Sequence, residues 1–304
     1  MNDKQKVGVL LSTYNGEKYV EEQLESILNQ TYPNIKIYVR DDGSSDHTLA
    51  VLEKYEKSGE ITLVKGKNVG FIKSFFELVK LCEDCEYVAY CDQDDIWLPE
   101  KISLAVETIS KKDNEKPILY FSNYDFYDSN MNFQSHCPDK KLMPSFENAL
   151  VDCISLGFNS VFNKSALKIM QQNIPNYSCG HDWWTYMVCV SMGEVIYDKR
   201  YTVKYRRHES NVSAGGMKFI AFQLWRLKKF FFNDYFKNIR LQLKEFENLY
   251  SDLLKEEDRK VLSLFTKDRY NFTTALKKVF YKKRFRSGIF DEIALRVIFL
   301  IGKL

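Results

Sequence analysis

Short apolar segments rich in branched residues alternate with segments of helical periodicity over the first third of the chain. The expected strands are Val7–Ser12, Ile35–Arg40, Ile61–Val64 and Tyr87–Cys91. The expected helices are Tyr19–Gln30, Thr48–Lys57, Phe71–Leu81 and one that follows Trp97-Leu98-Pro99, with Pro99 in its first turn. Strands and helices that alternate at this spacing predict a three-layer α/β domain, in which a mostly parallel mixed sheet lies between helices.

The composition is that of a globular protein, since 45% hydrophobic residues suffice for a sizeable core. The longest uninterrupted apolar stretches, such as Val297–Ile301, are far shorter than the ~20 residues that span a bilayer. The first residues show no signal-peptide pattern, and seven cysteines do not suit a closed disulfide framework. We therefore expect a protein of a reducing compartment, and not a secreted mini-protein, a membrane-spanning protein or a fibrous repeat.

Charge is distributed unevenly along the chain. Residues 217–304 contain 20 Lys and Arg against 10 Asp and Glu, whereas residues 1–216 contain 24 against 31. Helical spacing in the basic, aromatic part predicts helices at Phe219–Phe232, Phe236–Leu249, Glu256–Phe265 and Asp268–Phe280. We therefore expect an acidic α/β domain over 1–216 and a basic helical region over 217–304.

Polar clusters follow all four expected strands, at Ser12–Gly16, Asp41–Asp46, Lys67–Gly70 and Asp92–Asp95. Ligands of parallel α/β sheets bind outside the carboxyl ends of the strands, so the clusters mark the expected binding edge. Asp92 and Asp94 point to the same side of an extended backbone and suit Mg²⁺ or Mn²⁺, the alternative being a solvated acidic turn. Asp41 or Asp42 can accept a hydrogen bond from a pyrimidine, although this segment is also good turn and helix-cap material.

Two later segments also carry reactive side chains. Gly180-His181-Asp182-Trp183-Trp184 begins an expected helix, where aromatic faces can bind a sugar and Asp182 can take a hydroxyl proton. The alternative is a capping aspartate with two core tryptophans. In Tyr205–Asn211, Arg206 or Arg207 can pair with a phosphate, and His208 is either a metal ligand or a structural histidine. Residues 213–216 after it suit a mobile lid.

In order, these motifs resemble those of the family 2 glycosyltransferases, which have the Rossmann-like GT-A fold. The similarity covers about residues 5–215 and rests on Thr13-Tyr14-Asn15, Asp41–Asp46, Asn68-x-Gly70, Asp92-x-Asp94-Asp95 and Asp182. Cys91–Trp97, His181-Asp182-Trp183 and Tyr205-Arg206-x-His208 look most like bacterial rhamnosyltransferases of surface-polysaccharide assembly.

The resemblance implies a role for each matching residue. The nucleotide-binding residues are Thr13, Tyr14, Asn15, Asp41, Asp42, Asn68, Asp92, Gln93 and Arg206. Asp94 and His208 bind Mn²⁺ or Mg²⁺, and Asp182 is the catalytic base. The residues that contact the sugar or the acceptor are Trp97, His181, Trp183 and Trp184. Two positions depart from the family pattern: Ser12 replaces a common Pro, and His181 replaces the Glu of a Glu-Asp pair.

The implied reaction is a single displacement that inverts the anomeric centre. A metal and an arginine offset charge on the departing nucleoside diphosphate, while Asp182 deprotonates the acceptor hydroxyl. The expected donor is dTDP-L-rhamnose, giving an α-rhamnoside, and a UDP-hexose donor is the alternative. Gln223-x-x-Arg226 is followed by Leu227, unlike the processive members, which favours addition of a single sugar. A catalytically silent sugar-nucleotide-binding scaffold is the rival function, and a nucleotidyltransferase without its glycine-rich phosphate loop is a weaker one.

The basic tail predicts a place of action. Lys277–Arg286 interleaves cations with aromatic residues, which suits the anionic inner face of a membrane and a lipid-linked saccharide acceptor. We therefore expect a cytoplasmic protein that binds the membrane peripherally. Packing in a homo-oligomer is the alternative for this tail. Nucleic acid is not an expected partner, because the front domain is acidic and no nucleic-acid motif is present.

Overall fold

A computed structural model describes residues 5–141, 143–208, 235–267 and 269–304. The chain divides into two compact units: unit 1 comprises residues 1–139, 155–174 and 180–206, and unit 2 comprises residues 140–154, 175–179 and 207–304. The boundary expected after residue 216, the helix expected at 219–232 and the lid expected at 213–216 all lie outside the described residues. None of the described helices has both the length and the apolarity that a membrane crossing requires.

Unit 1 is built on a nine-stranded mixed sheet in the order β3-β2-β1-β4-β8-β6-β9-β5, with β7 paired to β6. The strands are β1 (Val7–Thr13), β2 (Ile35–Asp41), β3 (Ile61–Lys65), β4 (Tyr87–Cys91), β5 (Ile96–Trp97), β6 (Ile118–Tyr127), β7 (Phe133–His136), β8 (Ser160–Asn163) and β9 (Glu194–Arg206). The first four strands run parallel, and β8 runs antiparallel to both β4 and β6. The expected strands and their mostly parallel arrangement are confirmed.

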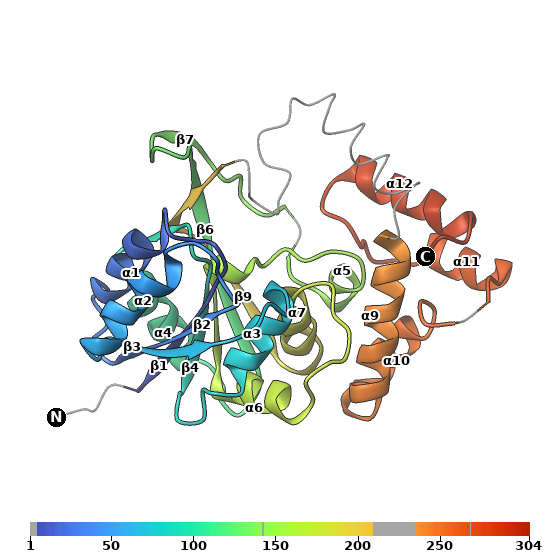
Figure 1. Ribbon diagram of the computed structural model, residues 1–304. Helices are drawn as coiled ribbons and strands as arrows, with labels where there is room; N and C mark the ends of the chain where they lie inside the picture. The colour runs from blue at the N-terminus through green and yellow to red at the C-terminus, as the bar shows by residue number, and fades with distance from the viewer. Residues whose placement is uncertain (1–4, 142, 209–234, 268) are drawn as a thin grey trace. The chain divides into compact units, whose positions relative to one another are not determined.

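Helices pack on both faces of the sheet (Figure 1). One group comprises α1 (Val20–Leu28), α2 (Thr48–Lys57) and α4 (Lys101–Ser110), and the other comprises α3 (Phe71–Val79), α6 (Lys164–Gln172) and α7 (His181–Met192). The three-layer α/β class predicted from the sequence is therefore confirmed. The expectation that Pro99 lies in the first turn of this helix is wrong, because α4 begins at Lys101 and Pro99 lies before its N-cap residue, Glu100.

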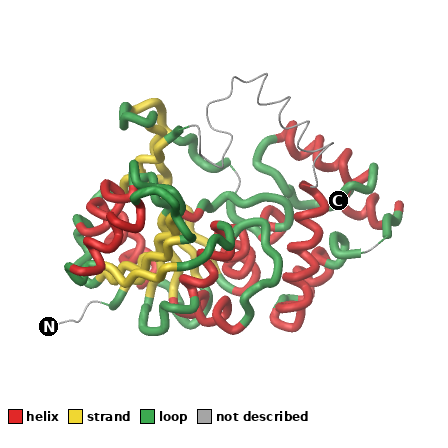
Figure 2. Tube along the Cα trace, viewed as in Figure 1, coloured by secondary structure: helices red, strands yellow, loops and turns green. Residues whose placement is uncertain are grey.

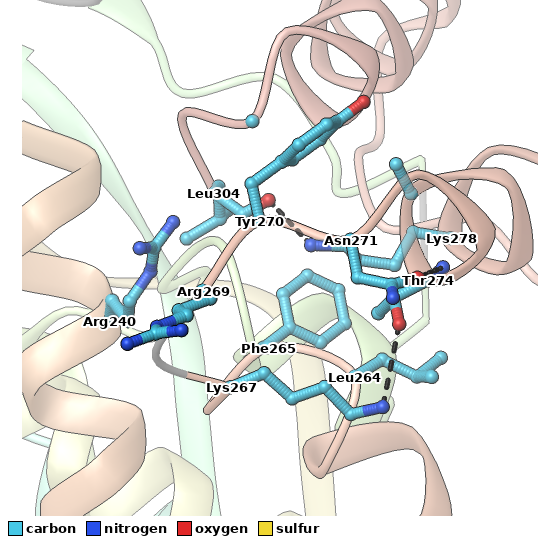
Figure 3. A pocket seen from close by; sticks show the side chains of 12 residues that line it. Arg240, Leu264, Phe265, Lys267, Arg269, Tyr270, Asn271, Thr274, Lys278 and Leu304 are labelled. Carbon is cyan, nitrogen blue, oxygen red and sulfur yellow. Dashed lines mark hydrogen bonds between the residues drawn. The ribbon is translucent and has the colours of Figure 1, made fainter.

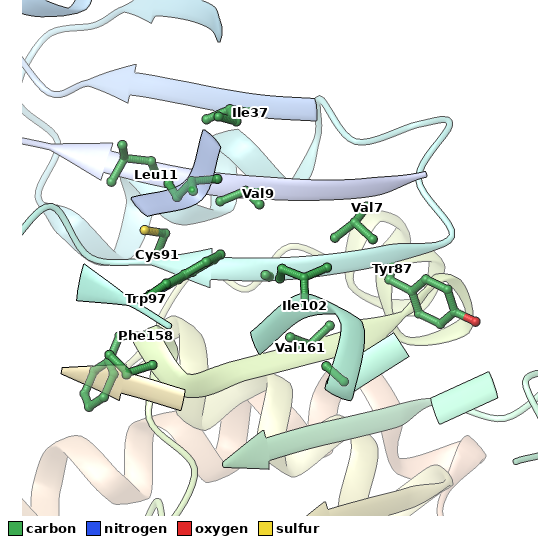
Figure 4. Packing of buried hydrophobic residues seen from close by; sticks show 14 of the residues in the cluster. Val7, Val9, Leu11, Ile37, Tyr87, Cys91, Trp97, Ile102, Phe158 and Val161 are labelled. Atoms are coloured by element: carbon green, nitrogen blue, oxygen red, sulfur yellow. The ribbon is translucent and has the colours of Figure 1, made fainter. Parts of the chain in front are cut away.

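The core of unit 1 explains why the strands are so apolar. Every residue of β4 is buried, as expected for a strand covered by helices on both faces. Val9 and Leu11 of β1 pack with Trp97 and Ile102 in one continuous cluster (Figure 4). This packing fixes the strand ends, which carry the polar loops, on a rigid support.

All the described elements of unit 2 are helical, as Figure 2 shows. They are α5 (Phe146–Ala149), α9 (Tyr235–Tyr250), η2 (Ser251–Leu253), α10 (Glu256–Leu262), α11 (Phe272–Val279) and α12 (Ile289–Leu300). The rings of Phe265, Phe285 and Phe299 are buried and contact one another with centroids 5.5–5.6 Å apart. The helices expected within 236–280 are confirmed, with both α10 and α11 shorter than expected.

Candidate functional site

The carboxyl ends of β1 and β2 meet at one edge of the sheet, where Thr13 pairs with Asp41 in register. The Thr13 hydroxyl donates a hydrogen bond to the Asp41 carboxylate over 3.2 Å. That carboxylate also accepts the backbone N–H groups of Gly43 (3.2 Å) and Ser44 (3.0 Å). Asn15, at φ +48°, accepts the Ser45 N–H at 2.8 Å and thereby joins the first two loops. The loops after β1 and β2 thus form one connected surface.

Asp42 has an internal role. Its buried carboxylate pairs with Arg40 and accepts the backbone N–H groups of Val69 and Gly70, each at 2.9 Å. These bonds fix the loop after β3, in which the exposed Asn68 side chain accepts the Gly70 N–H at 3.1 Å. Both oxygens of Asp42 thus bind the protein's own backbone, and its expected contact with the nucleotide stays a prediction.

Gln93 joins the acidic loop after β4 to the loop after β1. Its side-chain oxygen accepts the Tyr14 N–H at 2.9 Å, and its amide donates to the Tyr14 carbonyl at 3.2 Å. This reciprocal pair leaves the Tyr14 ring 47% exposed. Tyr14, Asn15 and Gln93, which the sequence predicts as nucleotide-binding, therefore lie in neighbouring loops at one edge.

The charges of two further acids act on Asp92. Burial raises the pKa of Asp92 to about 8, and the charges of Asp94 and Asp182 add to the shift. Asp182 therefore influences Asp92 electrostatically, although it is far away in the sequence. Carboxylate oxygens are the donors that Mg²⁺ and Mn²⁺ prefer, and a divalent cation would offset the negative charge of these acids. The acids present thus fit the metal that the sequence predicts.

Asp182 lies in the first turn of α7. Its oxygens accept the N–H of Trp183 at 2.8 Å and that of Gly157 at 3.2 Å. Burial raises the pKa of Asp182, and these two donors oppose that shift. Sequence reasoning missed Gly157, which begins the short helix η1 (Gly157–Asn159). A Cβ there would lie 2.8 Å from His181 Nε2, so only glycine allows this approach.

His208 belongs to unit 2, so its pairing with Asp94 stays a prediction. Within the described ranges, no three His, Cys, Asp or Glu side chains are placed together to hold a metal ion.

Arg206 is buried and binds the acidic loop that contains Asp94 and Asp95. Its guanidinium pairs with Glu22, donates to the carbonyl of Asp94 (2.8 Å) and that of Ser129 (3.2 Å), and lies over the Tyr19 ring. Its backbone N–H donates to the Asp95 carboxylate at 3.1 Å. In this structure the guanidinium of Arg206 binds protein groups, and its expected pairing with the diphosphate stays a prediction.

A buried acid and a buried lysine were missed by sequence reasoning. Asp95 and Lys101 are fully buried, and Lys101 Nζ lies 4.8 Å from the Trp97 ring centroid. Burial lowers the pKa of Lys101 to about 7, and the charges of Cys91 and Asp95 oppose that shift. The available signal was a lysine on the same buried side of α4 as Ile102 and Ala105.

The aromatic residues at the site divide into core and edge positions. Trp97 and Trp184 are buried within unit 1, which for Trp184 favours the alternative of a core tryptophan, and their expected contact with a sugar stays a prediction. Trp183 retains a small exposed fraction of 8%. The His181 ring stacks on the Phe75 ring with their centroids 3.8 Å apart, and it packs edge-on against Tyr90. Neither nitrogen of the His181 ring has a hydrogen-bond partner among the described residues.

His181 is expected to weaken the fold in acid. Burial lowers the pKa of its imidazole to about 3, whereas an unfolded histidine takes up a proton below about 6.5. The unfolded state therefore binds more protons between these values, and stability falls as the pH falls through this window. We expect a loss of about 2 kcal/mol by pH 5 that is absent from His181→Phe. Urea unfolding at pH 7 and pH 5 measures the difference. The exposed His136→Phe serves as control, and an equal loss in wild type and His181→Phe would contradict this account.

Known structures share this fold. The chain is similar to S. aureus TarS 1-349 in complex with UDP-GlcNAc, with a TM-score of 0.62 and 16% identity over 98% of this chain and 79% of that chain. It is also similar to the mannosyltransferase PcManGT from Pyrobaculum calidifontis in complex with GDP-Man and Mn²⁺, with a TM-score of 0.52 and 15% identity over 93% and 89% of the two chains. Both likenesses support the GT-A fold expected from the sequence.

Sequence relatives give the family. The chain is 30% identical over 229 residues to the dTDP-rhamnosyl transferase RfbG of Shigella flexneri, covering 69% of this chain and 76% of that protein. It is 24% identical over 287 residues to the uncharacterized glycosyltransferase RT0329 of Rickettsia typhi, covering 91% and 80%. The model of "Glycosyl transferase family 2" matches residues 8–170, more than half of the length. The chain therefore belongs to glycosyl transferase family 2.

Proposed function

We propose that this glycosyltransferase transfers L-rhamnose from dTDP-L-rhamnose to an acceptor hydroxyl, one sugar at a time and with inversion. The observation that supports the chemistry is that Asp92, in the loop after β4, interacts electrostatically with Asp94 and with Asp182 in the first turn of α7. Asp94 and His208 would hold Mn²⁺ or Mg²⁺, and Asp92 would contact the ribose of the donor. The metal supplies charge neutralisation for the leaving group.

Asp182 acts as the base in this proposal. The hydroxyl becomes acidic as its oxygen attacks the anomeric carbon, so a carboxylate can accept its proton. The oxygen–carbon bond forms as the bond to the diphosphate breaks, and one displacement gives an α-rhamnoside. Thr13, Tyr14, Asn15, Asp41, Asn68 and Gln93 surround the nucleotide, and Trp183 lies beside the acceptor.

The donor is proposed from the likeness to a dTDP-rhamnosyl transferase. A UDP-hexose is the alternative, supported by the fold shared with TarS bound to UDP-GlcNAc. The proposed acceptor is a lipid-linked saccharide precursor. The proposed location is the cytoplasmic face of a membrane, which the basic tail over 217–304 binds through anionic lipid. Packing of this tail in a homo-oligomer is the competing proposal.

The test is nucleoside-diphosphate release with Mn²⁺ from dTDP-rhamnose, UDP-glucose, UDP-galactose and UDP-N-acetylglucosamine. We expect release from dTDP-rhamnose alone, and we expect Asp94→Ala to reduce it at least about tenfold because the metal loses a ligand. Asp113→Ala, which removes an exposed acid from the same unit, is the matched control. Preference for a UDP-hexose would overturn the donor. Binding of dTDP by calorimetry without turnover, even with lipid-linked acceptor, would favour the silent scaffold.

A further inference from the structure

Part of the basic and aromatic stretch at 277–286 is occupied inside unit 2, although Lys277, Phe280, Lys282, Lys283 and Arg284 are exposed. Phe285 is buried, and Lys278 Nζ donates to the Leu304 carbonyl at 2.5 Å beneath the rings of Phe265 and Phe299. Arg286 lies 3.0 Å from the Asp152 carboxylate. These side chains stabilise the unit and do not face a partner. The exposed cations of this stretch can still contact lipid phosphates, but insertion among acyl chains needs a further, apolar surface.

Helix α12 carries an apolar stripe that faces solvent. Its exposed members are Ile289 (64%), Phe290 (84%), Ile293 (57%), Val297 (49%), Leu300 (38%) and, just past the helix, Ile301 (51%). A helix turns by about 100° per residue, so these positions fall within an arc of about 120°. Leu295, Ile298 and Phe299 on the other side are buried. The helix is thus apolar on its exposed side as well, which marks an interaction surface.

The surroundings of this stripe are positively charged. Residues 269–304 contain nine Lys and Arg against two Asp and Glu. The cations Lys277, Lys282, Arg284 and Lys303 are exposed. Of the two acids, Glu292 is buried and lies 2.6 Å from Arg296. An apolar face carried by a cationic segment is complementary to an anionic lipid surface.

A basic pocket lies at the carboxyl end of α12 (Figure 3). Arg240, Lys267 and Arg269 line it, and among the described residues no Asp or Glu side chain does. Lys267 Nζ donates to the Thr274 hydroxyl at 3.4 Å, which leaves further ammonium protons for a ligand. The Tyr270 hydroxyl donates to the Leu300 carbonyl at 2.8 Å and joins the pocket to the end of the stripe. Cations that could bind a phosphate therefore stand next to an apolar face.

We propose that α12 lies in the interface of an anionic bilayer, with its stripe among the acyl chains and the surrounding cations on lipid phosphates. The helix has 12 residues and is about 18 Å long, so it lies parallel to the surface instead of crossing it. This inference rests on the proposed membrane association and names its surface. A second copy of the chain is the competing occupant.

The test is flotation of the full chain with vesicles of phosphatidylcholine, with and without phosphatidylglycerol. Wild type is expected to float with the anionic vesicles only. Ile293→Ser with Val297→Ser is expected to lower the partition coefficient about tenfold or more, because two apolar insertions are lost. Leu253→Ser, at a 61% exposed position of the same unit off the stripe, is the matched control and is expected to float like wild type.

A second pair tests the cations. Lys282→Ala with Arg284→Ala is expected to reduce flotation and to make flotation less dependent on salt. Lys111→Ala, at an exposed position, is the control and is expected to change neither. Equal flotation of wild type and the Ile293/Val297 variant, or flotation independent of phosphatidylglycerol, would overturn the proposal. The proposal would also be overturned if the wild type bound no vesicle but formed a dimer, and the Ile293/Val297 variant dissociated that dimer. The assay contains no nucleotide sugar, so its failure leaves the proposed transfer reaction standing.

Discussion

Changing Asp182 to Asn is expected to slow sugar transfer by about 10²- to 10⁴-fold while nucleotide binding is retained. The amide keeps the shape of the side chain, and its oxygen can still accept one of the N–H groups of Gly157 and Trp183. It cannot take the proton of the acceptor hydroxyl. Because one of the charges that act on Asp92 is removed, the pKa of Asp92 should also fall towards its ordinary value. Initial rates measure sugar transfer, and calorimetry with dTDP measures nucleotide binding separately.

Asp113→Asn, an exposed change in the same unit, controls for the loss of a charge. Transfer by Asp182→Asn within a few-fold of wild type would show that another group is the base. Parallel loss of transfer and of dTDP binding would show that Asp182 supports the site without acting on the acceptor.

Changing Arg206 to Met is expected to lower the free energy of unfolding by about 2–4 kcal/mol. Two backbone carbonyls, those of Asp94 and Ser129, lose their donor, and the Glu22 carboxylate loses its cation. Half of the Glu22 side chain is exposed, so water replaces part of that ion pair. Urea unfolding measures the change.

Arg200→Met is the matched control, because Arg200 forms a half-exposed pair with Asp198 and is expected to cost about 1 kcal/mol or less. If Arg206→Met unfolds like wild type but binds dTDP weakly, Arg206 is a phosphate ligand after all. The result thus separates support of the acidic loop from contact with the donor.

Much of the fold could be predicted because the sequence pattern and the structure obey the same local physics. Apolar strands covered on both faces, such as β4, have no polar position, and helices on the faces keep their periodicity. Parallel strands also bring their carboxyl ends to one edge, so Thr13, Asp41 and Asp92 could be grouped from the sequence alone. The added antiparallel strand β8 gave no comparable signal.

Which acid or cation faces a ligand was decided by tertiary packing. Asp41 and Asp42 are neighbours of one type, yet Asp42 binds Arg40 and the backbone of a loop more than 20 residues away. Arg206 turns inward because Glu22 and two buried carbonyls lie within its reach, and Trp184 is buried because its side of α7 meets the core of unit 1. Likewise, Phe285 is core whereas Phe290 faces solvent. Residue type fixes what a side chain can bind and local pattern fixes the backbone, but burial depends on partners that are distant in the sequence, and these exist only once the chain has folded.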